Sequence, residues 1–201
     1  METILGDVIV WSWFSDPHGY NFNSLLIPDL DGNFCIDPVE PNDQVMKELV
    51  QTGVDSILLT NRNHVRAVNK IRDHTGARCY IHPADAAYAK GQGAALDDEL
   101  LDGETIGPFK VIGVSGKSPG EVALLWPARK TLIVGDAVIG NPPGRLSLLH
   151  ERVMDDPAGL RRSVRQLLEL DFDTILVGDG VHIIGDAKNR LKELVAGFKP
   201  A

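Results

Sequence analysis

The sequence predicts an α/β fold made of two β-sheets, each with helices on its outer face. Strand-like and helix-like patterns alternate along its 201 residues. The order of elements also repeats in the two halves of the chain. The first half has a strand ending in Ile36-Asp37, then a helix, then the strand VDSILLT at 54–60. The second half has a strand ending in Gly135-Asp136, then a helix, then the strand FDTILVG at 172–178. Because no linker-like segment divides the chain, we expect a single domain over residues 1–201.

The first part of the chain is typical of an antiparallel meander followed by a helix. We expect strands at 7–14, 21–27 and 33–37, with the turn Asp31-Gly32 between the last two. A helix fits residues 43–52, where Asp43 can cap the start and Gly53 follows the end.

A buried strand at 54–60 and a second helix at 63–75 come next. Val65, Val68 and Ile71 lie on one face of that helix, and Gly76 suits its left-handed end. A short strand at 79–82 leads to Pro83, where another helix begins, and the polar residues 91–103 are typical of a loop.

The second half predicts three hairpin-connected strands and then a helix, a strand and a helix. The three strands are expected at 109–114, 122–126 and 131–134. Asp155-Asp156-Pro157 combines a cap with Pro in the first helical turn, so a helix should run from there to about 170. A strand at 173–177 and a helix from 185 to 197 complete the chain.

Composition and charge exclude several classes of function. Apolar residues make up 43% and charged residues 24% of the chain, as in an ordinary globular protein. The net charge of −8 argues against nucleic acid or an anionic membrane surface as a partner. Cys35 and Cys79 lie in apolar runs without Cys-x-x-Cys spacing, so we expect two buried thiols. The start lacks the charged and apolar regions of a secretory signal, which favours a cytoplasmic protein.

Polar side chains gather where the predicted strands end, and loops at strand ends are the usual place for ligands in layered α/β folds. We expect the functional pocket there, with His64 and His182 as neighbours of its central residues. Those central residues are Asn61, Asn63, Val65, Arg66, Lys117, Asp136 and Asp179.

Four ordered motifs over roughly residues 19–184 resemble the metallo-β-lactamase-fold hydrolases. NFNSLLIPDLDGNFCIDPV is similar to the early hairpin of that family, and ILLTNRNHVRAV to its Thr-His-x-His-x-Asp-His loop. VIGVSGKSPGEVALLWPARKTLIVGDAV is similar to its Gly-His-Thr-Pro-Gly hairpin and the strand ending in Gly-Asp, and FDTILVGDGVHI to its last strand and Gly-His-Gly turn. The resemblance implies a four-layer αββα sandwich of two mixed β-sheets with helices on the outer faces.

The same resemblance implies a two-metal site, but six of the seven ligand positions differ in this chain. The histidines of the first motif fall on Asn61, Asn63 and Arg66, and its aspartate on Val65. The hairpin histidine falls on Lys117 and the final histidine on Asp179, while the bridging aspartate is kept as Asp136.

Charged lysine and arginine have no lone pair to offer a metal, so we expect no two-metal site and favour no cofactor. A single Zn, Mn or Fe ion held by Asp136, Asp179 and His64 is the alternative. Our main hypothesis is that Lys117, with Arg66 or Arg62, supplies the positive charge that metal supplies in the family. Two carboxylates brought together repel by several kcal/mol, on the order of what an ammonium within ~4 Å offsets.

Two functions therefore remain open. The first is a pseudoenzyme that binds a small anion, another small molecule or a partner protein; the second is a hydrolase of an ester, thioester, phosphodiester or amide with an altered one-metal or metal-free site. A homo-oligomer is compatible with both. A triad of Ser118, a histidine and Asp136 is a further alternative, although the sequence has no nucleophile-elbow spacing. Gly116-Lys117-Ser118 lacks the first glycine of a phosphate loop.

Overall fold

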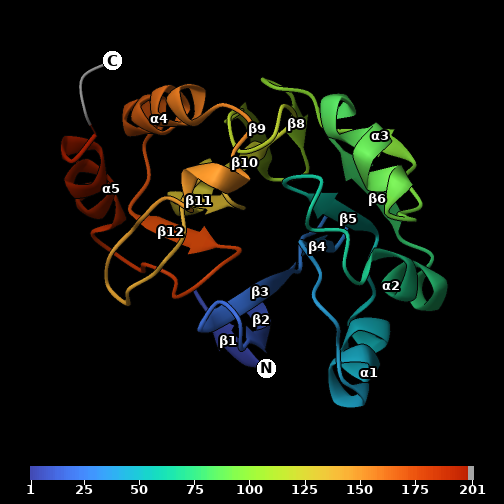
Figure 1. Cartoon of the computed structure of the whole chain (residues 1–201). Coiled ribbons are helices and arrows are strands. Elements are labelled where there is room, and N and C mark those ends of the chain that lie inside the picture. Colours follow the sequence, from blue (N-terminus) through green and yellow to red (C-terminus); the bar gives the residue numbers. More distant parts are fainter. Residues whose placement is uncertain (199–201) are drawn as a thin grey trace. The chain divides into compact units, whose positions relative to one another are not determined.

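The computed structural model describes residues 1–198 (Figure 1). These residues form two compact units, and the boundary between them in the sequence lies between residues 100 and 101. We call residues 1–100 the N-terminal unit and the described residues from 101 onward the C-terminal unit. Each unit has its own β-sheet, its own helices and its own hydrophobic core.

The N-terminal unit contains a mixed sheet of seven strands in chain order. The joins from β1 to β4 are antiparallel, which confirms the predicted meander, and the joins from β4 to β7 are parallel. The strands are β1 (Glu2–Ile4), β2 (Val8–Ser15), β3 (Tyr20–Ile27), β4 (Phe34–Ile36), β5 (Ser56–Leu59), β6 (Arg78–Ile81) and β7 (Asp98–Glu99).

Three helices pack against this sheet: α1 (Asp43–Thr52), α2 (Val68–Thr75) and α3 (Pro83–Gly91). Their apolar side chains, such as Leu49 and Ile71, share one buried cluster with Ile57 of β5. The bounds of α1 match the prediction, but its cap is Asn42, whose side chain accepts from the Val45 N–H, and not Asp43.

The second helix begins at Val68, whereas periodicity predicted a start at residue 63. Local hydrogen bonds explain the difference. The Asn61 side chain accepts from the Asn63 N–H at 2.8 Å, and the Asn61 carbonyl accepts from the His64 N–H at 3.3 Å. These bonds hold residues 61–64 in a turn, and such turns compete with helix formation.

The C-terminal unit contains a mixed sheet of five strands in the order β12-β11-β10-β9-β8. Antiparallel pairing of β9, β10 and β11 confirms the three predicted hairpin strands, and β11 pairs with β12 in parallel. The strands are β8 (Thr105–Ile106), β9 (Phe109–Gly113), β10 (Val122–Trp126), β11 (Thr131–Val134) and β12 (Thr174–Val177).

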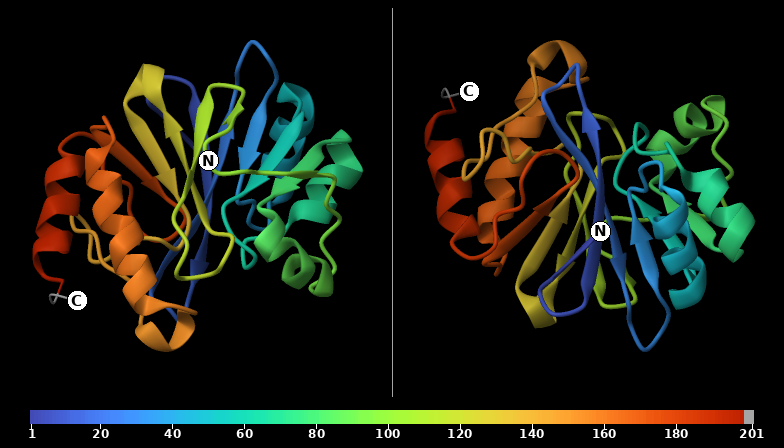
Figure 2. Two further views of the ribbon diagram at one scale, coloured as in Figure 1. Left: turned by 90° about the horizontal axis from the view of Figure 1, so that it is seen from above. Right: turned by 90° about the horizontal axis from the view of Figure 1, so that it is seen from below.

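The helices α4 (Pro157–Gln166) and α5 (Ala187–Ala196) lie side by side along this second sheet (Figure 2). Asp156 caps α4, as predicted, by accepting from the Gly159 N–H. Leu160 and Leu191 join Val134 and Val177 in the core of the unit. Three short 3₁₀ turns complete the element order: η1 (Pro127–Arg129), η2 (Glu151–Val153) and η3 (Leu167–Glu169).

Within the described part of the chain, two mixed sheets and five α-helices confirm the predicted α/β class. The sequence did not predict β1, β7 and β8, which have two or three residues each. Both cysteines are buried free thiols, as predicted, and burial raises the pKa of Cys79 to about 12. Among residues 1–198, no helix is long and apolar enough to cross a membrane.

Candidate functional site

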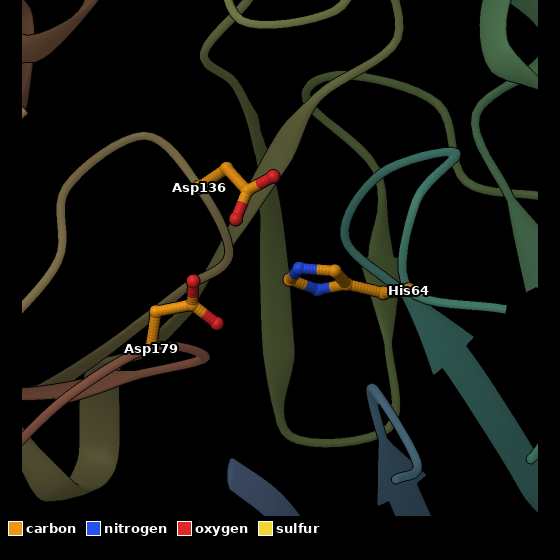
Figure 3. Close-up of side chains that lie close together, drawn as sticks. All are labelled: His64, Asp136 and Asp179. Carbon is orange, nitrogen blue, oxygen red and sulfur yellow. The ribbon is translucent and has the colours of Figure 1, made fainter. Parts of the chain in front are cut away.

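Asp136 and Asp179 lie at equivalent places beyond two neighbouring parallel strands. Val134 of β11 pairs with Val177 of β12, and each aspartate follows its valine by two residues. Figure 3 shows the two carboxyl groups pointing toward one another. One carboxylate oxygen of each residue lies within 4.8 Å of one from the other, and both residues are buried. This is the carboxyl edge of the parallel pair, where α/β folds commonly place functional groups.

Lys117 comes to the same edge on the loop between β9 and β10. The Val114 N–H donates to the Glu121 carbonyl and closes the loop, and the Gly116 carbonyl accepts from the Asp156 N–H at 2.7 Å. Gly116 has a φ of +137°, and a Cβ there would lie 2.2 Å from the Leu160 backbone nitrogen. Only glycine therefore allows this loop to approach the first turn of α4 so closely.

The Lys117 ammonium forms a buried ion pair with Asp136. Its Nζ lies 2.7 Å from Oδ2 of Asp136, and the two side chains are only 4% and 7% exposed. At an effective dielectric of about 20, the Coulomb attraction between the ammonium and the Asp136 carboxylate at this distance is about 6 kcal/mol. The repulsion between the carboxylates of Asp136 and Asp179, within 4.8 Å, is about 3.5 kcal/mol or more. The ammonium thus offsets the repulsion that arises when two carboxylates are buried together.

In the N-terminal unit, the ends of β4 and β5 carry a second buried polar network. Asp37 follows β4 with a φ of +49°, and its carboxylate accepts from the Thr60 N–H at 2.8 Å and from the Thr60 hydroxyl at 2.6 Å. The Nδ1 of His64 lies 2.8 Å from the same carboxylate, and His64 is fully buried. A carboxylate that holds one nitrogen of an imidazole fixes the orientation of the ring.

The remaining predicted pocket residues of this unit have different environments. Asn61 is fully buried, and within residues 1–198 its Nδ2 has no hydrogen-bond partner. Asn63 and Arg66 are exposed, and the Arg66 guanidinium stacks 4.2 Å from the centre of the Phe22 ring. Val65 is partly buried and packs against the core of the unit. Arg62, the other predicted cation, stacks 4.6 Å from the centre of the Tyr88 ring.

His182 lies three residues after Asp179 and is partly buried. Its Nδ1 accepts from the Val177 N–H at 3.1 Å, so the neutral ring carries its proton on Nε2. Burial lowers the pKa of His182 to about 4. The ring is therefore neutral at pH 7, and it supports the end of β12.

Several residues at the predicted ligand positions are poor metal donors. Val65 has no donor atom, and Arg66 is a cation stacked on an aromatic ring. The Asn61 side-chain Oδ1 already accepts from the Asn63 N–H, and Lys117 places an ammonium against Asp136. Carboxylate oxygens of Asp136 and Asp179 are suitable ligands for a single ion, which would have to displace Lys117. The single-ion alternative that includes His64 stays a prediction.

The role of Asp37 was not recognised in the sequence. The Ile36-Asp37 ending supported the fold, but nothing marked its carboxylate as the partner of Thr60 and His64. The predicted order strand, helix, strand indicates that β4 and β5 are parallel neighbours. Residues just beyond the ends of two such strands lie close together, which would have placed Asp37 beside Thr60.

Comparisons with known proteins agree with this architecture. The sequence model of the metallo-beta-lactamase superfamily matches residues 3–198. An uncharacterized protein of Aquifex aeolicus (strain VF5) is 26% identical over 162 residues, which cover 71% of this chain and 75% of that protein. A metallo-beta-lactamase from Pontibacter korlensis has a TM-score of 0.80 at 15% identity, covering 97% of this chain and 96% of that one. A protein solved in a di-iron-bound form has a TM-score of 0.68 at 24% identity, covering 87% and 94%.

Proposed function

The chain belongs to the metallo-beta-lactamase superfamily, and from that premise we propose that it is a member without the two-metal centre, a pseudoenzyme that binds a small anionic ligand. The ammonium of Lys117 supplies positive charge at the aspartate pair. It cannot act as a Lewis acid or lower the pKa of a bound water, which is what a metal contributes to hydrolysis.

The buried Lys117–Asp136 pair is the observation that carries this proposal. Both groups are nearly inaccessible and lie 2.7 Å apart, so a metal ion at Asp136 would meet a resident cation. Removing that ammonium would leave two carboxylates within 4.8 Å of each other, which is an attractive arrangement for a divalent ion. Lys117 therefore excludes the metal that its neighbours would otherwise favour.

Metal analysis of the full chain tests the proposal. Protein purified without chelators should contain far less than one equivalent of Zn, Fe or Mn by plasma mass spectrometry. K117M should bind added Mn²⁺ at least about tenfold more tightly in calorimetry, since several kcal/mol of like-charge repulsion are removed. The matched control is K130M, which removes an exposed lysine paired with Asp171 and should leave Mn²⁺ affinity unchanged. Stoichiometric metal in the wild-type protein would contradict the proposal.

The second candidate is a hydrolase of an ester, thioester, phosphodiester or amide with one metal ion. One feature favours it: two aspartates and one lysine leave a formal charge of −1 at this edge of the sheet, which a divalent ion could neutralise. The structural relative in a di-iron-bound form is compatible with this alternative. Hydrolysis that Mn or Zn stimulates and that D136A abolishes would support it against the pseudoenzyme.

A further inference from the structure

A surface depression in the N-terminal unit gathers basic and amide side chains. Its volume is about 260 Å³, just below the range of about 300–1,000 Å³ that is usual for ligand pockets. It is lined by Asn63, Val65, Arg66, Asn69, Lys70, Gln92, Gly93 and Ala94. Two of these residues are cations, three carry amides and none is acidic, although the whole chain has a net charge of −8. We propose that this depression binds a small phosphate-bearing ligand.

The walls of the depression are held in place before any ligand arrives. The Asn69 amide donates to the Gly93 carbonyl at 2.8 Å and accepts from the Ala95 N–H at 2.9 Å, which ties α2 to the chain after α3. The Gln92 amide donates to the Arg62 carbonyl at 2.6 Å. Arg66 is oriented by its stacking on Phe22. Fixed walls reduce the entropy that binding must remove, so even a small ligand can bind specifically.

The start of α2 adds positive potential at the same place. Ala67, the residue before the helix, has no side chain that can cap it, and Asn69 and Lys70 of the first turn both line the depression. The Val68 N–H already donates to the Val65 carbonyl, so the helix contributes the positive end of its dipole, which favours an anion here. An Arg fork and an ammonium together suit the several oxygens of a phosphate.

Glu40 is the group that competes with the ligand. The Lys70 ammonium pairs with its carboxylate, and the two side chains are 42% and 62% exposed. Such exposed pairs contribute little free energy, so a phosphate can take the place of Glu40 beside Lys70. Removing the Glu40 charge should therefore tighten binding, whereas removing either cation should weaken it.

This inference names an anion site for the proposed binding function and rests on that proposal. Its test is a titration of the full, isotope-labelled chain with inorganic phosphate at constant ionic strength, followed by the backbone amide signals of Asn69 and Lys70. Saturable shifts are expected, with affinity lowered at least about tenfold in R66Q and in K70Q and raised a few-fold in E40Q. The matched control is K47Q, an exposed lysine of α1, which should leave the affinity unchanged.

Three outcomes would overturn the inference. They are shifts that do not saturate, an equal loss of affinity in K47Q, and acetate binding as tightly as phosphate, which would assign a carboxylate ligand instead. The altered side chains are exposed, so loss of fold is not expected, and circular dichroism checks this. Metal content is a separate readout: bound metal in the wild-type protein would contradict the pseudoenzyme proposal, whereas the phosphate titration alone decides this site.

Discussion

Replacing Lys117 by Met should destabilise the protein more than any surface charge substitution. The change leaves Asp136 buried beside Asp179 without its ammonium partner. The lost attraction is a Coulomb term of about 6 kcal/mol and the remaining repulsion is about 3.5 kcal/mol or more at an effective dielectric of about 20. Relaxation and water entry reduce such terms, and removal of one partner of a buried pair usually costs about 3–5 kcal/mol. We expect a loss in that range.

Urea unfolding at pH 7, followed by circular dichroism, measures this loss. For a chain of this size, about 3–5 kcal/mol corresponds to a fall in melting temperature of roughly 6–20 °C. The matched control is K130M, whose lysine and partner Asp171 are 63% and 80% exposed, and it should change stability by less than about 0.5 kcal/mol.

A double substitution separates the ion pair from simple packing. K117M with D136N removes both charges at once, so it should cost less than the sum of the single changes, with a coupling energy of about 2–3 kcal/mol. A K117M protein within about 1 kcal/mol of wild type, or additive single changes, would refute the reasoning that Lys117 compensates the aspartates.

Three further predictions concern the surroundings of the site. Burial lowers the pKa of His182 to about 4, so between pH 4 and about 6.5 the unfolded chain binds more protons than the folded chain. The free energy of unfolding should therefore fall by up to about 3 kcal/mol as the pH drops through that window. An H182Q protein whose free energy of unfolding depends on pH as steeply as that of the wild type would contradict this. G116A should lower the free energy of unfolding by at least about 2 kcal/mol, since the added Cβ would overlap the α4 backbone. The control G144A, also at positive φ but with nothing within 4 Å of the added Cβ, should lower it by about 1 kcal/mol. Equal losses of stability in thermal unfolding would be inconsistent with a close approach of Gly116 to α4. T60V removes the hydroxyl that donates to Asp37 and should lower the free energy of unfolding by about 1–3 kcal/mol, whereas T60S keeps the hydroxyl and should lower it by less than about 1 kcal/mol. If T60S were the less stable variant, this hydrogen bond would not be the cause of the loss.

The sequence predicted most of the fold because its signals are local. The cap Asp156 before Pro157 predicts the start of α4, and short apolar segments predict the strands β9 to β11. The start of α2 was predicted five residues too early, since side-chain and backbone bonds at Asn61 outweigh helical periodicity. The short strands β1, β7 and β8 were not predicted, because such segments become strands only through the neighbour they pair with.

Motif order singles out the residues of the candidate site but not their contacts. Motif order placed Lys117 and Asp136 near the end of β11, and the structure adds the 2.7 Å distance between them. The environment of His64 was not predicted, because its partner Asp37 lies 27 residues earlier and the two are brought together only by the pairing of β4 with β5. The stacking of Arg66 on Phe22 likewise depends on the sheet and not on sequence spacing.

The identity of the cation decides which chemistry the aspartate edge retains. A metal ion brings two charges, open coordination positions and exchangeable water, so it can bind and activate a nucleophile. Lys117 brings one charge on a tethered ammonium that already donates to Asp136, and it offers no coordination position. It can therefore keep the two aspartates buried and the loop in place while contributing nothing to the activation of water. Under the proposed function, a chain that keeps the fold and the aspartate but holds this lysine would retain the structural role of the centre without its metal chemistry.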